Sequence, residues 1–563
     1  MKRILLSTAA VILAGTGQLF AVDVTGDRLD IGLNHGLIGT YATIAGGEQN
    51  TNSAEWGVIS GGAINSVGTG TTNGTYASVI AGGLYNTVRA SLGAIGGGSY
   101  NYIDPVATNA VIAGGNGNAT YASHAAIGGG RGNVVAADTA TIAGGYQNEA
   151  IGTMSFIGGG FQNQNSNPYS AIGGGFQNFS SGSVTFIGGG SYNLISTNAT
   201  NSVIAGGSVN SVTSPFAAIG GGSANSVSGQ SAVVAGGFQN YNIAPASVVS
   251  GGARNRNNHG YSVIGGGVVN SNTGAFSTIG GGSNNVSTLF GTVAGGAENS
   301  SGSYGAVGGG FGNVNTSTAG TIGGGVWNTA GGWATVSGGY SNAASGQLSF
   351  AGGGVQNTAS GQYSVVGGGN GNVSAGLGVT ISGGVGNSSG IFIPWATIGG
   401  GSGNQANGIH STIPGGAQAL ADKTGQQAYA SGRFATNGDA QTSLFVLRRL
   451  TTNSVERELF LDGSNARMVL STGSTWTFDA LVSGRSDTGN SAGYKFTGVI
   501  ENVSGTVALV GSVLKTTVGE DVGNWDANMV ADDANNALVI NVVGATNSPV
   551  RWVSYVRTAE VRY

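Results

Sequence analysis

An apolar residue recurs at a fixed phase along most of this chain, and a pair of glycines and then an asparagine follow it. One copy reads Ile157-Gly158-Gly159-Gly160-Phe161-Gln162-Asn163. The unit is Ile or Val, a small residue, Gly-Gly, two variable residues and Asn. It recurs 25 times between Tyr41 and Ala419, mostly at steps of 15 residues, and only the last copy lacks the Asn. A fixed short period of this kind is typical of a solenoid whose coils stack on their neighbours.

Each column of the repeat has a physical interpretation. A β-branched residue fits an inward position of a short strand, and the small or hydroxylic residue two places earlier, such as Ser155, suits a strand's alternation. The glycines supply backbone conformations that other residues avoid. The Asn tolerates a left-handed turn and can form an amide ladder between coils. The sequence therefore predicts an all-β parallel β-roll or β-solenoid of about 25 fifteen-residue coils, thin enough that we expect an oligomer.

The two ends of the chain differ from the repeats. Met1-Lys2-Arg3, an apolar run and small residues up to Ala21 have the layout of a secretory signal peptide. Residues 420–563 carry 26 charged side chains, against 10 in residues 41–419, and strand-like runs such as 475–478 and 537–540 alternate with turns. We predict a signal peptide at 1–21, a cap or linker at 22–40, the repeat domain at 41–436, and an antiparallel β-sandwich or jelly-roll domain at 437–563.

Composition narrows the chemistry further. Glycine makes up 111 of 563 residues, only 42 residues are charged, and there is no cysteine. Nucleic-acid binding is not expected, because the chain has no surplus of basic residues to contact phosphates. The mature chain has no apolar stretch of about 18 residues, so we predict no membrane-spanning segment in it. The four histidines, at 35, 124, 259 and 410, lack metal-ligand spacing. The local acid clusters 456/458, 520/521 and 532/533 are interpreted as surface charges. We therefore expect no enzyme activity, no cofactor and no metal.

Aromatic side chains are the candidate ligand contacts. Tyr146, Phe161 and Phe176 occupy the same phase of three consecutive coils and are expected to stack into a ladder. The ladder either packs against a turn or a neighbouring chain, or forms an adhesive stripe. In the C-terminal domain Trp476, Trp525 and Trp552 either stack on sugars or fill the core.

Several short sequence motifs resemble those of a known family. Tyr261-Ser262-Val263-Ile264-Gly265-Gly266-Gly267 is similar to the head repeats of YadA-like trimeric autotransporter adhesins, and the Gly-Gly-x-x-Asn variant resembles bacterial surface proteins and phage fibres. Residues 428–435 resemble the closing half-coil of that family. The resemblance implies a left-handed, trimeric roll, although the family typically uses a period of about 14 residues. Four motifs in the C-terminal region resemble the tips of phage-like tail fibres, namely residues 459–463, 474–478, 494–498 and 551–553.

These observations lead to one expectation and three alternatives. We expect an exported, non-enzymatic, homotrimeric fibre at a bacterial surface or in the medium, with the roll as a spacer and the C-terminal domain as an adhesive tip for a glycan or cell-surface receptor. The alternatives are a receptor-binding tail fibre of a phage or injection system, a self-polymerising extracellular filament, and a polysaccharide hydrolase. The sequence identifies neither the ligand nor the means of attachment to a cell.

Overall fold

The computed structural model describes residues 21–23, 28–69, 74–546 and 548–563. All but the last residue of the predicted signal peptide lie outside the described residues. The chain divides into two compact units, Met1–Asn284 and Asn285–Tyr563, which are taken one at a time below. Within the described residues every regular element is a strand. None of the described segments is a helix that could carry the chain through a membrane.

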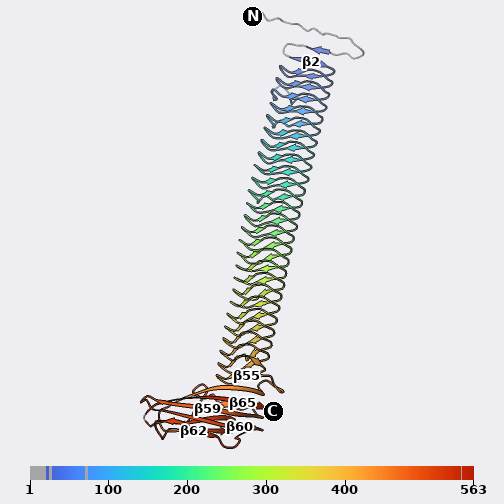
Figure 1. The fold of residues 1–563 in the computed structure, drawn as a ribbon. Coiled ribbons are helices and arrows are strands. Elements are labelled where there is room, and N and C mark those ends of the chain that lie inside the picture. Colours follow the sequence, from blue (N-terminus) through green and yellow to red (C-terminus); the bar gives the residue numbers. More distant parts are fainter. Residues whose placement is uncertain (1–20, 24–27, 70–73, 547) are drawn as a thin grey trace. The chain divides into compact units, whose positions relative to one another are not determined.

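The first unit is a stack of short coils (Figure 1). It opens with an antiparallel pair, β1 (Ala21–Asp23) and β2 (Leu29–Gly32), and continues with β3 (Gly36–Leu37). Two columns of two-residue parallel strands follow. The even-numbered column runs from β4 (Thr43–Ile44) to β34 (Thr278–Ile279), and the odd-numbered column runs from β5 (Thr51–Asn52) to β33 (Ser271–Asn272). Each strand pairs in register with its counterpart one coil away, as Ile142 does with Ile157. The predicted parallel β-solenoid is confirmed.

Each coil makes a third parallel contact that the repeat pattern did not predict. The first variable residue after the glycines forms a single β-bridge to its counterpart, for example Tyr146 to Phe161 and Phe161 to Phe176. The next residue, such as Gln147 or Gln162, has a φ near +50°. The left-handed residue of this turn is thus the one before the Asn, and the expected left-handed Asn is wrong. The turn needs this conformation where the chain reverses direction.

The Asn column forms the amide ladder that the sequence predicted, and the structure adds that this ladder is buried. Asn163 is fully buried, and its Nδ2 donates to the carbonyl oxygens of Gly159 and Gly175 at 2.9 Å each. Its Oδ1 accepts the backbone N–H of Asn178 at 3.0 Å. Gly160 shows why glycine precedes it: φ is +89°, and a Cβ there would lie 2.1 Å from the Gly175 carbonyl oxygen. The coils therefore approach too closely for any side chain at this position.

The second unit contains further coils and an antiparallel domain. Its coils run from β35 (Val286–Ser287) and β36 (Thr292–Val293) to β51 (Gln405–Ala406), β52 (Thr412–Ile413), β53 (Gly416–Ala417) and β54 (Leu420–Ala421). The longer strands that follow are β55 (Gln427–Ser431), β56 (Ala440–Thr451), β57 (Arg457–Glu458), β58 (Met468–Val469), β59 (Ser474–Ser486), β60 (Ser491–Val503), β61 (Thr506–Leu509), β62 (Leu514–Glu520), β63 (Asp526–Asp532), β64 (Ala537–Val543) and β65 (Val550–Arg562). β55 joins the two parts, since it pairs parallel with β52 and antiparallel with β56.

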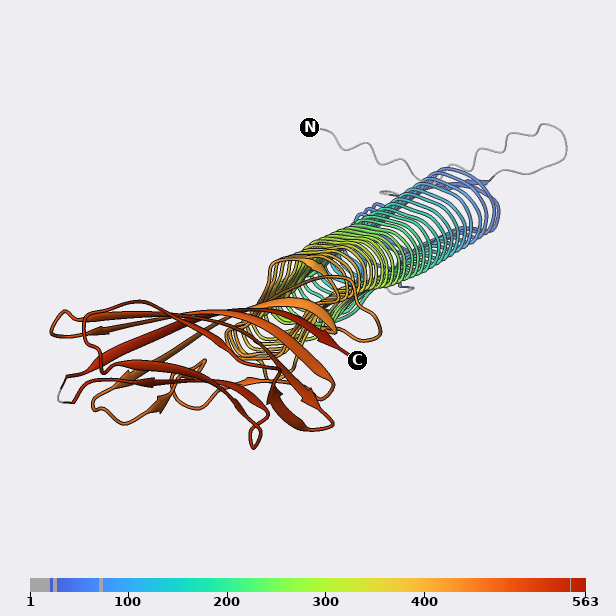
Figure 2. The same cartoon turned by 60° about the horizontal axis from the view of Figure 1, so that its bottom comes forward.

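Two antiparallel sheets share one core in this domain (Figure 2). In the larger sheet β65 lies between β56 and β59, and β60 pairs with β59 on the other side. In the smaller sheet β64 pairs with β57, β58 and β63. Phe445, Phe478 and Trp552 of the larger sheet pack in one buried cluster with Leu538 and Ile540 of the smaller one. Strand alternation leaves the opposite face of the larger sheet exposed.

Candidate functional site

The aromatic ladder of the first unit is stacked as predicted. The ring centroids of Tyr146 and Phe161 lie 5.0 Å apart with an interplanar angle of 13°, and those of Phe161 and Phe176 lie 5.0 Å apart at 9°. The guanidinium of Arg131 sits 5.7 Å from the Tyr146 ring centroid. Both faces of Phe161 are therefore covered by neighbouring rings, and a sugar that stacks on an aromatic face finds none free there. The geometry favours the packing interpretation of this ladder.

The three candidate tryptophans lie in the core of the antiparallel domain. Trp476, Trp525 and Trp552 are only 3%, 2% and 1% exposed. The rings of Trp525 and Trp552 are 5.6 Å apart, and the indole N–H of Trp552 donates to Thr451 Oγ1 at 3.0 Å. Burial at this level leaves their ring faces in contact with protein rather than with a ligand. The structure therefore does not bring the six sequence candidates together.

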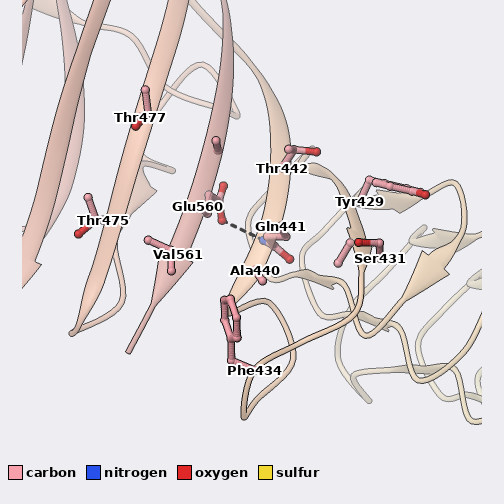
Figure 3. A pocket seen from close by; sticks show the side chains of 12 residues that line it. Tyr429, Ser431, Phe434, Ala440, Gln441, Thr442, Thr475, Thr477, Glu560 and Val561 are labelled. Carbon is pink, nitrogen blue, oxygen red and sulfur yellow. Dashed lines mark hydrogen bonds between the residues drawn. The ribbon is translucent and has the colours of Figure 1, made fainter.

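A groove that sequence reasoning missed crosses the exposed face of the larger sheet. Two hollows of about 550 and 730 Å³ adjoin, because Thr442, Thr477 and Ala559 line both. Figure 3 shows the first hollow from close by, with Phe434 and Tyr429 on one side and Thr475 and Thr477 on the other. Together the two hollows extend over strands β55, β56, β65, β59 and β60.

The strand register explains the depth of the groove. Ala559 on β65 is directly opposite Thr442 on one side and Thr477 on the other. Side chains of directly opposed residues stand side by side on the same face of a sheet. A methyl group between two threonines lowers the floor of the groove and leaves the two hydroxyl groups along it.

Two carboxylates lie beside the groove, one on each face of the sheet. In the second hollow the carboxylate of Asp479 lies 3.6 Å from Lys495 Nζ and 3.5 Å from Arg557 Nη2. Behind the first hollow Glu560 accepts hydrogen bonds from Gln441 Nε2 at 2.9 Å, drawn as a dashed line in Figure 3, and from Thr558 Oγ1 at 2.5 Å. Of these two carboxylates Asp479 faces the groove, whereas Glu560 follows the inward alternation of β65 and bonds to the buried Gln441 and Thr558 on the other face of the sheet.

Asp439 holds the loop that carries the exposed ring of Phe434. Its buried carboxylate accepts the backbone N–H groups of Phe434, Ala435 and Thr436 at 2.9, 2.6 and 2.7 Å. Burial alone would raise the pKa of Asp439, but these N–H groups and the nearby Arg562 guanidinium favour the charged form and hold the pKa below its usual range. Charge-assisted hydrogen bonds to this carboxylate therefore fix the loop that forms one wall of the groove.

The groove residues were not recognisable from the sequence. Asp479 and Glu560 lie in separate strands, far apart in the chain, and neither belongs to the acid clusters considered above. The one usable signal was the alternation of inward and outward side chains along strands 440–451, 474–486 and 550–562. Once these strands are identified, the alternation marks Thr442, Thr477 and Ala559 as outward residues. The pairing order of the strands, which brings them together, carries no local signal.

Comparisons with known proteins give distant structural neighbours. No protein-family model and no curated protein matches the chain. One solved structure is the tailspike protein gp49 of Acinetobacter baumannii bacteriophage Fri1, a capsular polysaccharide depolymerase, at 8% identity and a TM-score of 0.16, covering 78% of this chain and 79% of that one. Another is the tailspike protein of Acinetobacter phage vB_ApiP_P1, at 8% identity and a TM-score of 0.13, covering 92% of this chain and 82% of that one.

The first neighbour corrects one expectation from the sequence. We predicted that the chain is not an enzyme, and this prediction is contradicted, because gp49 is a depolymerase. We therefore withdraw the exclusion of catalysis. At a TM-score of 0.16 the likeness carries no argument for a particular activity of this chain. Since no family model matches, membership of the YadA-like family stays a prediction.

Proposed function

We propose that this chain is a fibre subunit of the tail-fibre type, in which a β-solenoid shaft carries a C-terminal domain that binds a saccharide on a cell surface. The observation that carries the proposal is the groove over Thr442, Thr477 and Ala559, on an exposed sheet face. A repetitive shaft supports this role because each coil contacts only its neighbours, so the number of coils sets its length.

The groove has the chemistry that saccharides require. Threonine hydroxyls and the Asp479 carboxylate offer hydrogen-bond partners for sugar hydroxyls. Phe434 is 80% exposed and Tyr429 is 52% exposed at the mouth of the groove, so each can present a ring to the apolar face of a sugar. One shallow groove gives weak binding, and a homotrimer would raise the avidity through three simultaneous contacts. The trimeric state is part of this proposal.

The decisive experiment measures saccharide binding by the full-length chain. Immobilised capsular and cell-wall polysaccharides are probed with the wild type, with Thr477→Leu and with the matched control Thr506→Leu. Thr506 is exposed on β61 and lies outside the groove. Thr477→Leu should weaken binding at least tenfold, about 1.4 kcal/mol, while the control binds as the wild type does. Equal binding by all three proteins, or no binding by the wild type, would refute the groove as the receptor site.

Cleavage of the bound polysaccharide is a second candidate function. The observation in its favour is the Asp479 carboxylate, which faces the groove between Lys495 and Arg557, since glycoside hydrolysis uses carboxyl groups as acid, base or nucleophile. New reducing ends should appear on incubation with the polysaccharide and disappear in Asp479→Asn, whereas Glu560→Gln, on the other face of the sheet, should still release them. Binding without any release of reducing ends would leave the receptor role and reject the hydrolase.

A tail fibre and a surface fibre can share the same shaft and C-terminal domain, and secretion of the chain distinguishes the two. The start of the chain predicts a secretory signal peptide that is cleaved after Ala21, which favours a secreted or cell-surface fibre. N-terminal sequencing of the protein from its native source tests this. A chain that begins at Val22 supports the exported fibre or filament, and a chain that begins at Met1 in a particle supports the tail fibre.

A further inference from the structure

Three arginines gather on the exposed face of the larger sheet, at the end away from the groove. They are Arg448 on β56, Arg485 on β59 and Arg551 on β65. Arg551 pairs in register with Arg485 on one side and with Leu450 on the other. Like charges placed directly opposite on one face of a sheet destabilise it. Arg485 and Arg551 therefore repel each other in the folded domain, and a neutral residue at either position would remove this repulsion.

No carboxylate in the described part of the domain neutralises this arginine cluster. The recorded ion pairs involve other cations, namely Lys423, Arg467, Lys495, Lys515 and Arg557. Arg448 donates to the backbone oxygen of Asp462 at 2.7 Å, and Arg485 donates to Ser491 Oγ at 3.0 Å. These partners orient the guanidinium groups without cancelling their charge.

The cluster does not reflect a basic domain. Residues 420–563 hold 12 Lys and Arg against 14 Asp and Glu, a net charge of −2. Asp487 is a carboxylate among the residues that line one of its hollows, and it accepts a hydrogen bond from Ser548 Oγ at 2.8 Å. Positive charge is thus concentrated at one place in a chain that is otherwise poor in charge.

Two hollows flank the central arginine. One, of about 480 Å³, is lined by Arg485 and Ser486, and the other, of about 300 Å³, is lined by Arg448 and Arg449. Leu450 and Arg551 line both, so Arg551 stands between them. Arg449 is held in place by the ring of Phe460, 5.3 Å from its guanidinium carbon. The arrangement offers guanidinium groups to two neighbouring anions at once.

We propose that this arginine cluster binds the anionic groups of an acidic polysaccharide. A guanidinium group matches the geometry of a carboxylate or a phosphate and can bind it through two parallel hydrogen bonds. A polymer with a charge on each repeating unit would place successive anions in the two hollows. The inference rests on the proposed function and names the chemistry of the receptor. Arg551 lies eight residues from Ala559 along β65, or roughly 27 Å at about 3.4 Å per residue, so the cluster is separate from the groove.

The test uses the full-length chain and three defined probes: polygalacturonate for carboxylate, poly(glycerol phosphate) for phosphate and dextran as a neutral polymer. The variants are Arg551→Gln and the double variant Arg485→Gln/Arg551→Gln. The control is Arg254→Gln, which removes the same charge from an exposed solenoid position where the previous coil already has Gln239. We expect the double variant to bind at least one acidic probe tenfold more weakly, with the control unchanged and dextran unbound.

Two further readouts separate a binding site from a structural one. Because Arg485 and Arg551 repel each other, Arg551→Gln should raise Tm while it weakens binding. Affinity of the wild type for the acidic probes should fall steeply between about 50 and 200 mM salt, because salt in this range screens pairs of exposed charges. Acidic-probe binding that is unchanged in the double variant overturns the inference. Binding of a neutral surface polysaccharide in the groove, with no acidic binding, overturns the inference and leaves the proposed function standing.

Discussion

The asparagine ladder offers a direct test of how the solenoid is held together. Replacing Asn163 with alanine removes an acceptor for the buried backbone N–H of Asn178 and the bonds that Nδ2 donates to Gly159, Gly175 and Asn148 Oδ1. The Gly175 carbonyl keeps the backbone N–H of Phe161 as a partner at 2.8 Å. An orphaned buried N–H costs about 1–3 kcal/mol, and the lost bond to Gly159 costs about 1 kcal/mol more. The expected local destabilisation is therefore about 2–4 kcal/mol.

Hydrogen exchange is the appropriate measurement, because a long repeat array need not unfold in one step. Peptides that cover residues 164–178 should exchange about 30- to 700-fold faster in Asn163→Ala, since each 1.4 kcal/mol corresponds to a factor of ten. The control is Gln162→Ala, one residue away. Gln162 belongs to an exposed amide ladder, in which it donates to Gln147 Oε1 at 2.9 Å.

Loss of an exposed side-chain bond changes stability by less than about 0.5 kcal/mol. Exchange in Gln162→Ala should therefore stay within about threefold of the wild type. If Asn163→Ala exchanges no faster than this control, the buried ladder does not hold adjacent coils together, and the reasoning above is refuted.

Three further predictions concern other parts of the chain. Gly160→Ala should disrupt folding, because its Cβ would meet the Gly175 oxygen at 2.1 Å, whereas Gly144→Ala, with nothing within 4 Å, should give a normal yield and Tm. The charged Asp439 carboxylate stabilises its loop above the ordinary pKa of aspartate, and this stabilisation is lost as pH falls through the lower pKa of the folded state. Proteolysis of residues 432–438 should therefore increase below about pH 4. In Asp439→Asn, proteolysis of this loop should be fast already at pH 7. Trp552→Phe should lower the unfolding free energy of the antiparallel domain by about 1–3 kcal/mol, through the lost bond to Thr451 and lost contact area, as followed by near-UV circular dichroism.

The repeat made the solenoid predictable from the sequence. The Ile and Asn columns have a fixed phase, so Ile157 can be placed inside the coil and Asn163 in a ladder between coils without knowledge of any distant contact. The bridge at Tyr146 and Phe161 was missed because two variable positions separate the glycines from the Asn, and their side chains give no strand signal. The ladder of rings was predicted from its phase alone, and the structure adds that the ring faces cover one another.

The sequence by itself determined the local and periodic features: the coils, the inward columns, the glycines at close backbone approach and the strand character of the C-terminal domain. Only the tertiary structure decided which strands of that domain are neighbours. The groove over Thr442, Thr477 and Ala559 and the cluster of Arg448, Arg485 and Arg551 both depend on β65 lying between β56 and β59. Contacts between coils repeat at a constant separation along the chain, so periodicity reveals them. Contacts between β56 and β65 join residues about a hundred positions apart, and they are set by how the whole domain packs its shared core.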